Sequence, residues 1–223
     1  MKKEVIDIGN LRMQNEARFV GQIISEVKFH HKMGYKEYYY FILCTKRSNG
    51  QEDHIPIIID KYNAKSYKLQ KNDYIVINGE LRSHNYKASD NKMHVSTYVL
   101  VLFLAKLSEE DFKEIGYLNS IMLEAYLCKD PIYRKTPLGK FITDLTIVVN
   151  REFNKSGYLH AIAWGEPIQK YISKLTTKDL LSIEGAFNSR KYNKSINNDI
   201  IERECYELSI HRIGVIDESN SEI

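Results

Sequence analysis

An internal repeat constrains the fold of this chain more than any other feature of its 223 residues. Residues 15–107 and 119–216 carry the same features in the same order, at an offset of about 105 residues. The matched segments are 15–23 with 119–127, 38–46 with 143–151, 54–60 with 159–165, and 73–81 with 179–187. Because each copy of a repeated unit of this size can enclose its own core, we expect two domains of similar fold.

The composition of the repeated segments predicts β-strands. They are rich in Tyr, Ile, Val and Thr and are separated by polar turns. The other elements are a helix-like stretch and a closing strand, at 61–69 and 93–104 in the first half and at 166–175 and 204–213 in the second. Gly79 and Gly185 occupy the same place in the fourth strand, where a strongly bent barrel strand favours a residue without Cβ.

The order of these elements, three strands, a helix and two strands, resembles the oligonucleotide-binding (OB) fold. We therefore expect an all-β protein with two tandem five-stranded OB barrels, each with one short helix between strands 3 and 4. The expected boundaries are 1–107 for the N-terminal domain, 108–116 for an acidic linker, 117–216 for the C-terminal domain and 217–223 for a polar tail. Ser108 and Asp111 are spaced as in a capping box, which predicts a helical turn in the linker.

Composition excludes several classes of protein. No apolar run approaches the roughly 18 residues that a membrane span needs, and the N-terminus does not resemble a signal peptide, so we expect a cytoplasmic protein. Cys44, Cys128 and Cys205 fit neither a disulfide framework nor a C-x-x-C motif, and we expect them to be reduced and buried. A net charge of +3 is only mildly basic, so the placement of the charges has to decide whether nucleic acid is a partner.

Catalytic and metal-binding motifs are missing from the sequence. It contains no P-loop, no G-x-S-x-G elbow and no dinucleotide-binding fingerprint, and the seven histidines have no metal-ligand spacing. Asp60, Asp144 and Glu184 have no spacing that would bring them together as a nuclease carboxylate set. We therefore expect no enzyme activity, no cofactor and no metal site.

Three segments of the second half resemble the bacterial single-stranded DNA-binding protein (SSB) family. They are 130–139 (DPIYRKTPLG), 160–165 (HAIAWG) and 184–192 (EGAFNSRKY). The first half resembles the family more faintly, through 78–86 (NGELRSHNY). The resemblance implies sequence-independent binding of single-stranded DNA in replication, recombination or repair. Two OB units in one chain resemble the duplicated SSBs, which form homodimers with four OB units.

The resemblance also implies which side chains bind DNA, by stacking on bases and by contacting phosphates. The stacking aromatics of the second half would be Trp164, Tyr158, Tyr192 and Phe153, with Tyr192 in a polar, cationic loop. The cations beside them would be Arg134, Lys135, Lys140, Arg151, Lys155, Arg190, Lys191 and Lys194.

The first half has a poorer set of such residues. Asp53 stands at the expected equivalent of Tyr158, Ile59 at that of Trp164, and only Tyr86 stays in register with Tyr192. Because an acidic residue in the groove would repel phosphate, we expect this half to bind DNA more weakly or to serve in assembly. Its candidate contacts are Lys46, Arg47, Arg82, His84, Tyr86 and Lys87.

Several alternatives remain open at this point. Trp164 alternates with Ile162 along its strand, so it is either a core residue or a surface stacking residue. Strand alternation divides 38–44 into two faces; one must be core, and for the other we favour a subunit interface over a stacking surface. Residues 217–223 lack the acidic Pro-Phe ending through which family members recruit replication and repair proteins, which favours a specialised role. The rival functions are a protein-interaction or primosome-like module with weak DNA affinity, and an RNA-binding protein.

Overall fold

The structure is a computed structural model that describes residues 14–87, 91, 93–136, 138–151, 155–177, 179–196 and 199–216. The first half contains β1 (Asn15–Ile23), β2 (Lys28–Met33), β3 (Lys36–Lys46), β4 (Glu52–Asp60), α1 (Lys61–Ser66), β5 (Tyr74–Lys87) and β6 (Met93–Leu107). Helix α2 (Glu109–Ile115) connects it to the second half. That half contains β7 (Leu118–Leu127), β8 (Ile132–Lys135), β9 (Phe141–Arg151), β10 (Lys155–Trp164), α3 (Glu166–Ile172), β11 (Leu180–Ile196) and β12 (Asp199–Val215).

Strand pairing closes a five-stranded barrel in each half. In the first half the pairs run β1–β3, β3–β4, β4–β6, β6–β5 and β5–β1. The second half repeats this circuit with β7, β9, β10, β12 and β11. The pairs β4–β6 and β10–β12 are parallel, and the other pairs of each circuit are antiparallel. A short helix lies between the third and fourth strands, so the expected tandem OB architecture is confirmed.

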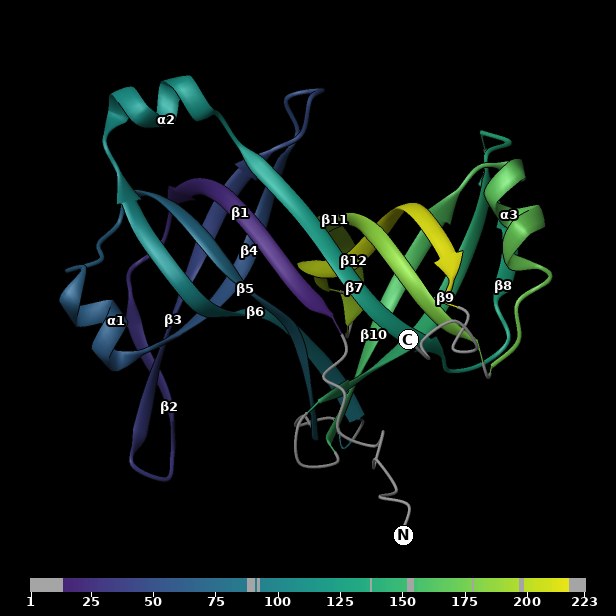
Figure 1. Ribbon diagram of the computed structural model, residues 1–223, viewed down its shortest axis with the longest axis horizontal. Helices are drawn as coiled ribbons and strands as arrows, with labels where there is room; N and C mark the ends of the chain where they lie inside the picture. Colours follow the sequence, from purple (N-terminus) through teal and green to yellow (C-terminus); the bar gives the residue numbers. More distant parts are fainter. Residues whose placement is uncertain are drawn as a thin grey trace, which may run out of the picture.

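The two barrels lie side by side and are joined by their first strands (Figure 1). β1 and β7 pair antiparallel, with Ala17 opposite Ile121, so all twelve strands of the described residues belong to one continuous sheet. Asn15 uses its side-chain amide to bond both the N–H and the C=O of Leu81, at 2.9 Å each. Asn119 does the same with Phe187, at 2.9 and 2.8 Å. These matching bonds relate the two halves by approximate two-fold symmetry.

The core of each barrel comes from alternate residues of the strands. On β4, Ile55, Ile57 and Ile59 are fully buried and face the interior, and on β3 Phe41 and Leu43 do the same. Since neighbouring residues of a strand point to opposite faces, the intervening residues of β3 belong to the outer surface. The interior face of 38–44 is therefore the one that carries Tyr39, which packs against the core.

The glycine in the fourth barrel strand is required by a close approach of backbone. At Gly79 an added Cβ would lie 2.3 Å from the carbonyl oxygen of Leu100, and at Gly185 it would lie 2.2 Å from that of Ser209. A β-bulge occurs at both glycines. The prediction that these positions need a residue without Cβ is confirmed.

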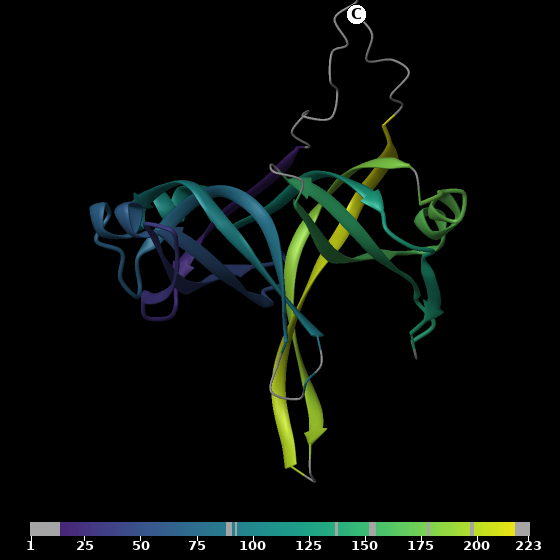
Figure 2. The same ribbon diagram turned by 90° about the horizontal axis from the view of Figure 1, so that it is seen from below.

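The structure adds strand at places where the sequence predicts loop. β2 and β8 form short hairpins with β3 and β9. Nearly all residues of β2 and β8 are exposed, so no alternation of apolar and polar residues predicts these two strands. β5, β6, β11 and β12 are longer than expected, and the β11–β12 hairpin projects well beyond both barrels (Figure 2). Tyr86 and Tyr192 therefore lie in strands, and the loop prediction for Tyr192 is wrong. Polar residues on both faces of a projecting hairpin hide its strand pattern in the sequence.

The capping box expected in the linker is present. The side chain of Ser108 accepts a bond from the N–H of Asp111 at 3.0 Å, and the N–H of Ser108 donates to the Asp111 carboxylate at 3.3 Å, so α2 begins there. Cys44 is buried but Cys128 is exposed and Cys205 half-buried, so the prediction of burial is wrong for these two, which lie at a strand end and on the projecting hairpin. None of the helices that the structure describes has the length and apolarity to cross a membrane.

Candidate nucleic-acid interface

The outer face of β10 carries two exposed aromatic side chains. Strand alternation places Tyr158, His160, Ile162 and Trp164 on this face. Ile162 is buried, but Trp164 is 45% exposed and Tyr158 is 42% exposed. Trp164 is therefore a surface residue, and the interpretation as a core tryptophan is wrong.

A shallow pocket with a cation on its wall adjoins Trp164. It is lined by Lys140, Phe141, Trp164 and Gly165. The Nζ of Lys135, which pairs with Phe141 across β8 and β9, lies 4.5 Å from the centre of the Phe141 ring. Two of the expected cations thus lie next to an aromatic surface, an arrangement that suits a stacked base with its phosphate.

Arg134 is held by a carboxylate on the same face. Its guanidinium donates to both carboxylate oxygens of Asp144, through Nη2 at 2.9 Å and through Nε. This bond and the positive charge of Arg134 lower the pKa of Asp144 below its usual value. His160 Nε2 lies 3.5 Å from the same carboxylate. The outer sheet between Trp164 and Tyr158 thus already contains a paired charge cluster.

Tyr192 lies on β11, opposite Arg203 of β12, and its side chain is 38% exposed. The two neighbouring cations have acidic partners on β12. The Nζ of Lys191 lies 2.9 Å from the carboxylate of Glu202, and the Nε of Arg190 lies 4.0 Å from that of Glu207. The Lys191–Glu202 pair is exposed on both sides, so it contributes little to stability and can exchange partners readily, whereas in the other pair only Arg190 is exposed.

Some predicted contacts fall outside what the structure describes. Phe153 lies outside the described residues. For Arg151, Lys155 and Lys194 only the backbone is described, at the β9–β10 turn and near the end of β11. Their contribution to the interface stays a prediction.

The first barrel presents a different set of side chains on β5. Tyr86 is 44% exposed and its ring stacks on His94 of β6 with a centroid distance of 5.7 Å. His84 and Lys87 are exposed on the same strand. Arg82 is half-buried and paired with the buried carboxylate of Glu80, so it is less available to a phosphate.

The two cations expected at the end of β3 are committed elsewhere. Arg47 Nη2 lies 2.6 Å from Asp53 Oδ1 and donates to the carbonyl oxygen of Ser189 in the second half at 3.2 Å. Lys46 Nζ lies 3.0 Å from Glu52 and 5.6 Å from the ring centre of Tyr117. Arg47 therefore holds the two halves together, and a DNA contact from it would break that pairing.

The expected equivalence between the halves is wrong by one residue in the third barrel strand. Ile57 pairs with Phe41 and Val99, as Ala161 pairs with Leu145 and Leu208. The offset there is 104 residues, since 161 minus 57 is 104. The equivalents of Tyr158 and Trp164 are therefore His54 and Asp60, in place of Asp53 and Ile59.

That shift takes Asp53 out of the first-half groove, while Asp60, the N-cap residue of α1, stands at the place of Trp164. A slip of one residue turns every side chain of a strand to the opposite face. Asp53 and Ile59 accordingly face inward and are fully buried. The prediction that Asp53 repels phosphate in the first-half groove is wrong, whereas the register of Tyr86 with Tyr192 agrees with the pairing, because each lies seven residues after the bulge glycine.

Aromatic side chains on the outer face of the first barrel were not among the predicted contacts. The ring of His31 on β2 stacks on Tyr38 of β3, with a centroid distance of 4.9 Å and an angle of 8°. Tyr40 follows on the same face and is half-buried. Burial raises the pKa of Tyr40, as does the negative charge of Glu204 on the β11–β12 hairpin. The outer face of β3 therefore meets the second half of the same chain. Strand alternation in the sequence predicts which side chains of β3 share this outer face, but it does not predict that the β11–β12 hairpin lies against it.

Comparisons with known proteins point to one family. Residues 118–214 match the model of the Single-strand binding protein family. Single-stranded DNA-binding protein 2 of Streptococcus agalactiae serotype V is 32% identical over 82 residues, which are 34% of this chain and 63% of that protein. Single-stranded DNA-binding protein A of Bacillus subtilis strain 168 is 31% identical over 81 residues, which are 34% of this chain and 47% of that protein. The chain thus spans less than two thirds of the length of these relatives.

A solved structure resembles the whole chain. The crystal structure of wild-type single-stranded DNA binding protein from Thermus aquaticus matches with a TM-score of 0.71 and 20% identity, over 96% of this chain and 98% of that chain. At this identity the likeness concerns the fold alone. Residues 118–214 thus match the Single-strand binding protein family, and the two closed barrels give the whole chain a duplicated OB-fold form like that of the Thermus aquaticus protein.

Proposed function

We propose that the chain binds single-stranded DNA without sequence preference, mainly through the C-terminal barrel. The observation that supports this most is the pair of exposed rings on β10, Trp164 and Tyr158, with Lys140 and Phe141 around the first. Every base offers a flat π face, so stacking is tolerant of sequence and contributes about 1–3 kcal/mol per base. The names of the relatives and the family match over residues 118–214 support the same function.

The phosphates contact cations in two ways in this proposal. Lys140 and Lys135 lie beside aromatic rings and can meet a phosphate directly. Arg134, Arg190 and Lys191 have exposed side chains and exchange a carboxylate partner for a phosphate when DNA binds. The exchange costs little at the Lys191–Glu202 pair, where both side chains are exposed and the ion pair is therefore weak. Tyr192 continues the path of the bound DNA strand along the β11–β12 hairpin.

The assembly and cellular role form part of the same proposal. A homodimer of this chain would bring together four OB units, and the first barrel would serve assembly and bind DNA more weakly. Coating of single strands in the cytoplasm, during replication, recombination or repair, requires binding and no chemical step. Replication and repair proteins are the expected protein partners.

A second candidate function is a protein-docking module with weak DNA affinity. This function is favoured by three carboxylates on the interface. Asp144, Glu202 and Glu207 each form an ion pair with one of the cations expected to bind DNA. If those acids belong to a surface for a basic protein partner, phosphates would be repelled at the same place.

Equilibrium binding of fluorescently labelled oligo(dT), measured by anisotropy with the full chain, tests the proposal. The same length of duplex DNA and of oligo(U) serve as controls. We expect tight binding of oligo(dT), weak binding of the duplex, and affinity that falls as salt rises because counterions are released. Absence of oligo(dT) binding at low salt would select the docking module, and a clear preference for oligo(U) would select an RNA-binding protein.

A further inference from the structure

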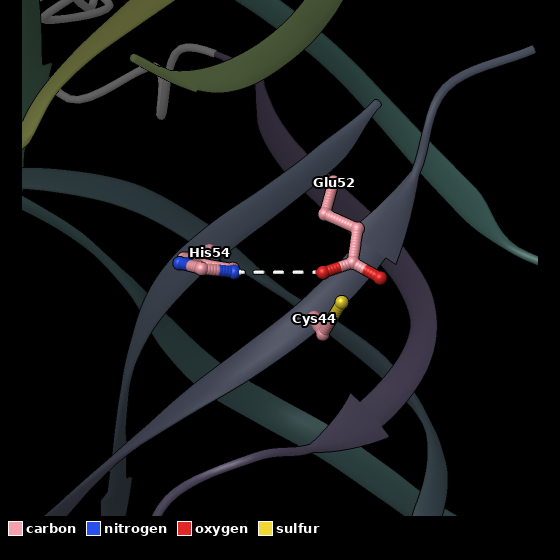
Figure 3. A group of neighbouring side chains, drawn as sticks. All are labelled: Cys44, Glu52 and His54. Carbon is pink, nitrogen blue, oxygen red and sulfur yellow. Dashed lines mark ion pairs between the residues drawn. The ribbon is translucent and has the colours of Figure 1, made fainter. Parts of the chain in front are cut away.

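Three side chains with metal-binding chemistry meet on the outer face of the first barrel. Cys44 of β3 lies directly opposite His54 of β4, and Glu52 precedes His54 by two residues on the same face. The Cys44 sulfur, a carboxylate oxygen of Glu52 and a ring nitrogen of His54 all lie within 4.8 Å of one another, and the three side chains converge in Figure 3. Strand pairing creates this group, which spacing along the chain does not indicate.

The geometry points to a binding site for Zn²⁺, with Cys44, Glu52 and His54 as protein ligands and water as the fourth. Zinc favours thiolate, imidazole and carboxylate donors in a tetrahedron with bonds of about 2.0–2.3 Å. Such bonds separate neighbouring ligand atoms by roughly 3.3–3.8 Å, which small side-chain rotations reach from the present positions. The thiolate and imidazole donors select zinc against Mg²⁺ and Ca²⁺, which prefer oxygen.

The second nitrogen of His54 has a carboxylate partner of its own. His54 Nε2 lies 3.9 Å from Glu52 Oε2, whereas Nδ1 lies 3.4 Å from Oε1 of Glu204. A carboxylate on one ring nitrogen fixes the orientation of the imidazole and makes the other nitrogen a better ligand. Glu204 thus acts as a positioning residue. Because it belongs to β12 of the second half, a bound metal would also stiffen the contact between the barrels.

The surroundings leave one oxygen of Glu52 for the metal. Lys46 Nζ lies 3.0 Å from Oε1, while Oε2 is the oxygen on the side of His54. Cys44 is only 5% exposed, whereas Glu52 is exposed, so the site has a shielded sulfur and an open side for entry. In the second barrel, Val148 and Tyr158 occupy the places of Cys44 and His54, given the offset of 104 residues. The proposal therefore predicts one such site per chain.

Titration of the reduced, metal-stripped full chain with Co²⁺ tests this site. Cobalt in a tetrahedral site with a thiolate ligand gives intense visible bands and a sulfur-to-metal charge-transfer band. We expect one Co²⁺ per chain with both features, and Zn²⁺ should displace it. The Cys44→Val variant introduces the residue type that the second barrel has at the equivalent position, Val148, and it should lose the charge-transfer band. The His54→Gln variant should weaken binding strongly, and Glu204→Gln should weaken it about 10- to 100-fold.

Matched controls separate this site from adventitious binding. Cys128→Ser removes an exposed thiol elsewhere, and His160→Gln removes a histidine that also lies beside a carboxylate, Asp144. Both should leave the cobalt spectrum unchanged, and circular dichroism should show all variants folded. The proposal is overturned if the intact chain gives no charge-transfer band, if Cys44→Val keeps it, or if Cys128→Ser removes it. Should Cys44→Val fail to fold, alkylation of Cys44 protected by Zn²⁺ decides instead, and equal labelling with and without Zn²⁺ overturns the site.

Discussion

Asp53 Oδ1 accepts a hydrogen bond of 2.8 Å from the backbone N–H of Ser189, which lies 136 residues later in the other barrel. The Asp53 carboxylate is fully buried, and Arg47 donates to both of its oxygens at 2.6 and 2.8 Å. Ser189 Oγ in turn accepts a bond from the N–H of His54 at 2.9 Å. These bonds tie β4 of one barrel to β11 of the other, in addition to the β1–β7 ladder.

Loss of the Asp53 carboxylate should therefore destabilise the chain strongly. The Asp53→Ala variant leaves the buried Ser189 N–H without its acceptor and removes the carboxylate partner of the half-buried Arg47 guanidinium, which typically costs about 2–4 kcal/mol. Denaturant unfolding followed by circular dichroism measures this cost. Asp130→Ala, at an exposed position, should change the free energy of unfolding by no more than about 0.5 kcal/mol. Equal losses in the two variants would contradict the role given to Asp53.

The fold was predictable because each half of the sequence carries the same pattern of strand and turn residues. Each half has alternating apolar residues and one bulge glycine, so the pattern of one half supports that of the other. The register of the third barrel strand was not predictable to one residue, because Ile55 to Ile59 is an apolar run without alternation. That ambiguity put Asp53 in the groove, whereas the ladder with β3 and β6 buries it.

The candidate site was predictable in its residue types and less so in its environment. Trp164 and Tyr192 are exposed as expected, since each continues a segment whose pattern resembles the family. The partners of the cations were not predictable. Arg134 meets Asp144, and Arg47 meets Asp53 and Ser189, through strand pairings and a contact between barrels that no local pattern encodes.

The bulge glycine of the second barrel should tolerate no side chain. A Cβ on residue 185 would lie 2.2 Å from the carbonyl oxygen of Ser209, so the Gly185→Ala variant has to move backbone and should lose about 2–3 kcal/mol of unfolding free energy. Gly214→Ala is the matched control, because nothing lies within 4 Å of its added Cβ. Thermal unfolding of the two variants compares them, and a Gly185→Ala protein as stable as Gly214→Ala would refute the close approach.

The exposed rings should contribute to DNA affinity one by one. We expect Trp164→Ala and Tyr192→Ala each to weaken oligo(dT) binding by about 1–3 kcal/mol, since each removes one stacking surface. Anisotropy titrations at fixed salt measure the change. Tyr62→Ala, which removes a 77% exposed tyrosine from α1, should leave the affinity as it is. Unchanged affinity in both interface variants would mean that the DNA path lies elsewhere.

Lowering the pH should reduce the free energy of unfolding, in part because Asp144 becomes protonated. Its hydrogen bond from Arg134 lowers the pKa of Asp144 below the ordinary value of 3.8, so the ionised carboxylate stabilises the folded state above that pH. This contribution is lost as the pH falls through the lowered pKa. We expect the free energy of unfolding to fall less between about pH 5 and pH 3 in Asp144→Asn than in the unmodified chain. An identical pH profile would contradict the lowered pKa.

The fluorescence of Trp164, the only tryptophan of the chain, tests most directly whether bases stack on the outer face of β10. Oligo(dT) is titrated into the full chain under conditions where anisotropy of a labelled strand reports binding, and duplex DNA of the same length is the control. Strong quenching of the tryptophan emission that saturates together with the anisotropy is the predicted result. Saturated binding with unchanged emission would contradict the account, because a base stacked on the Trp164 ring must quench it.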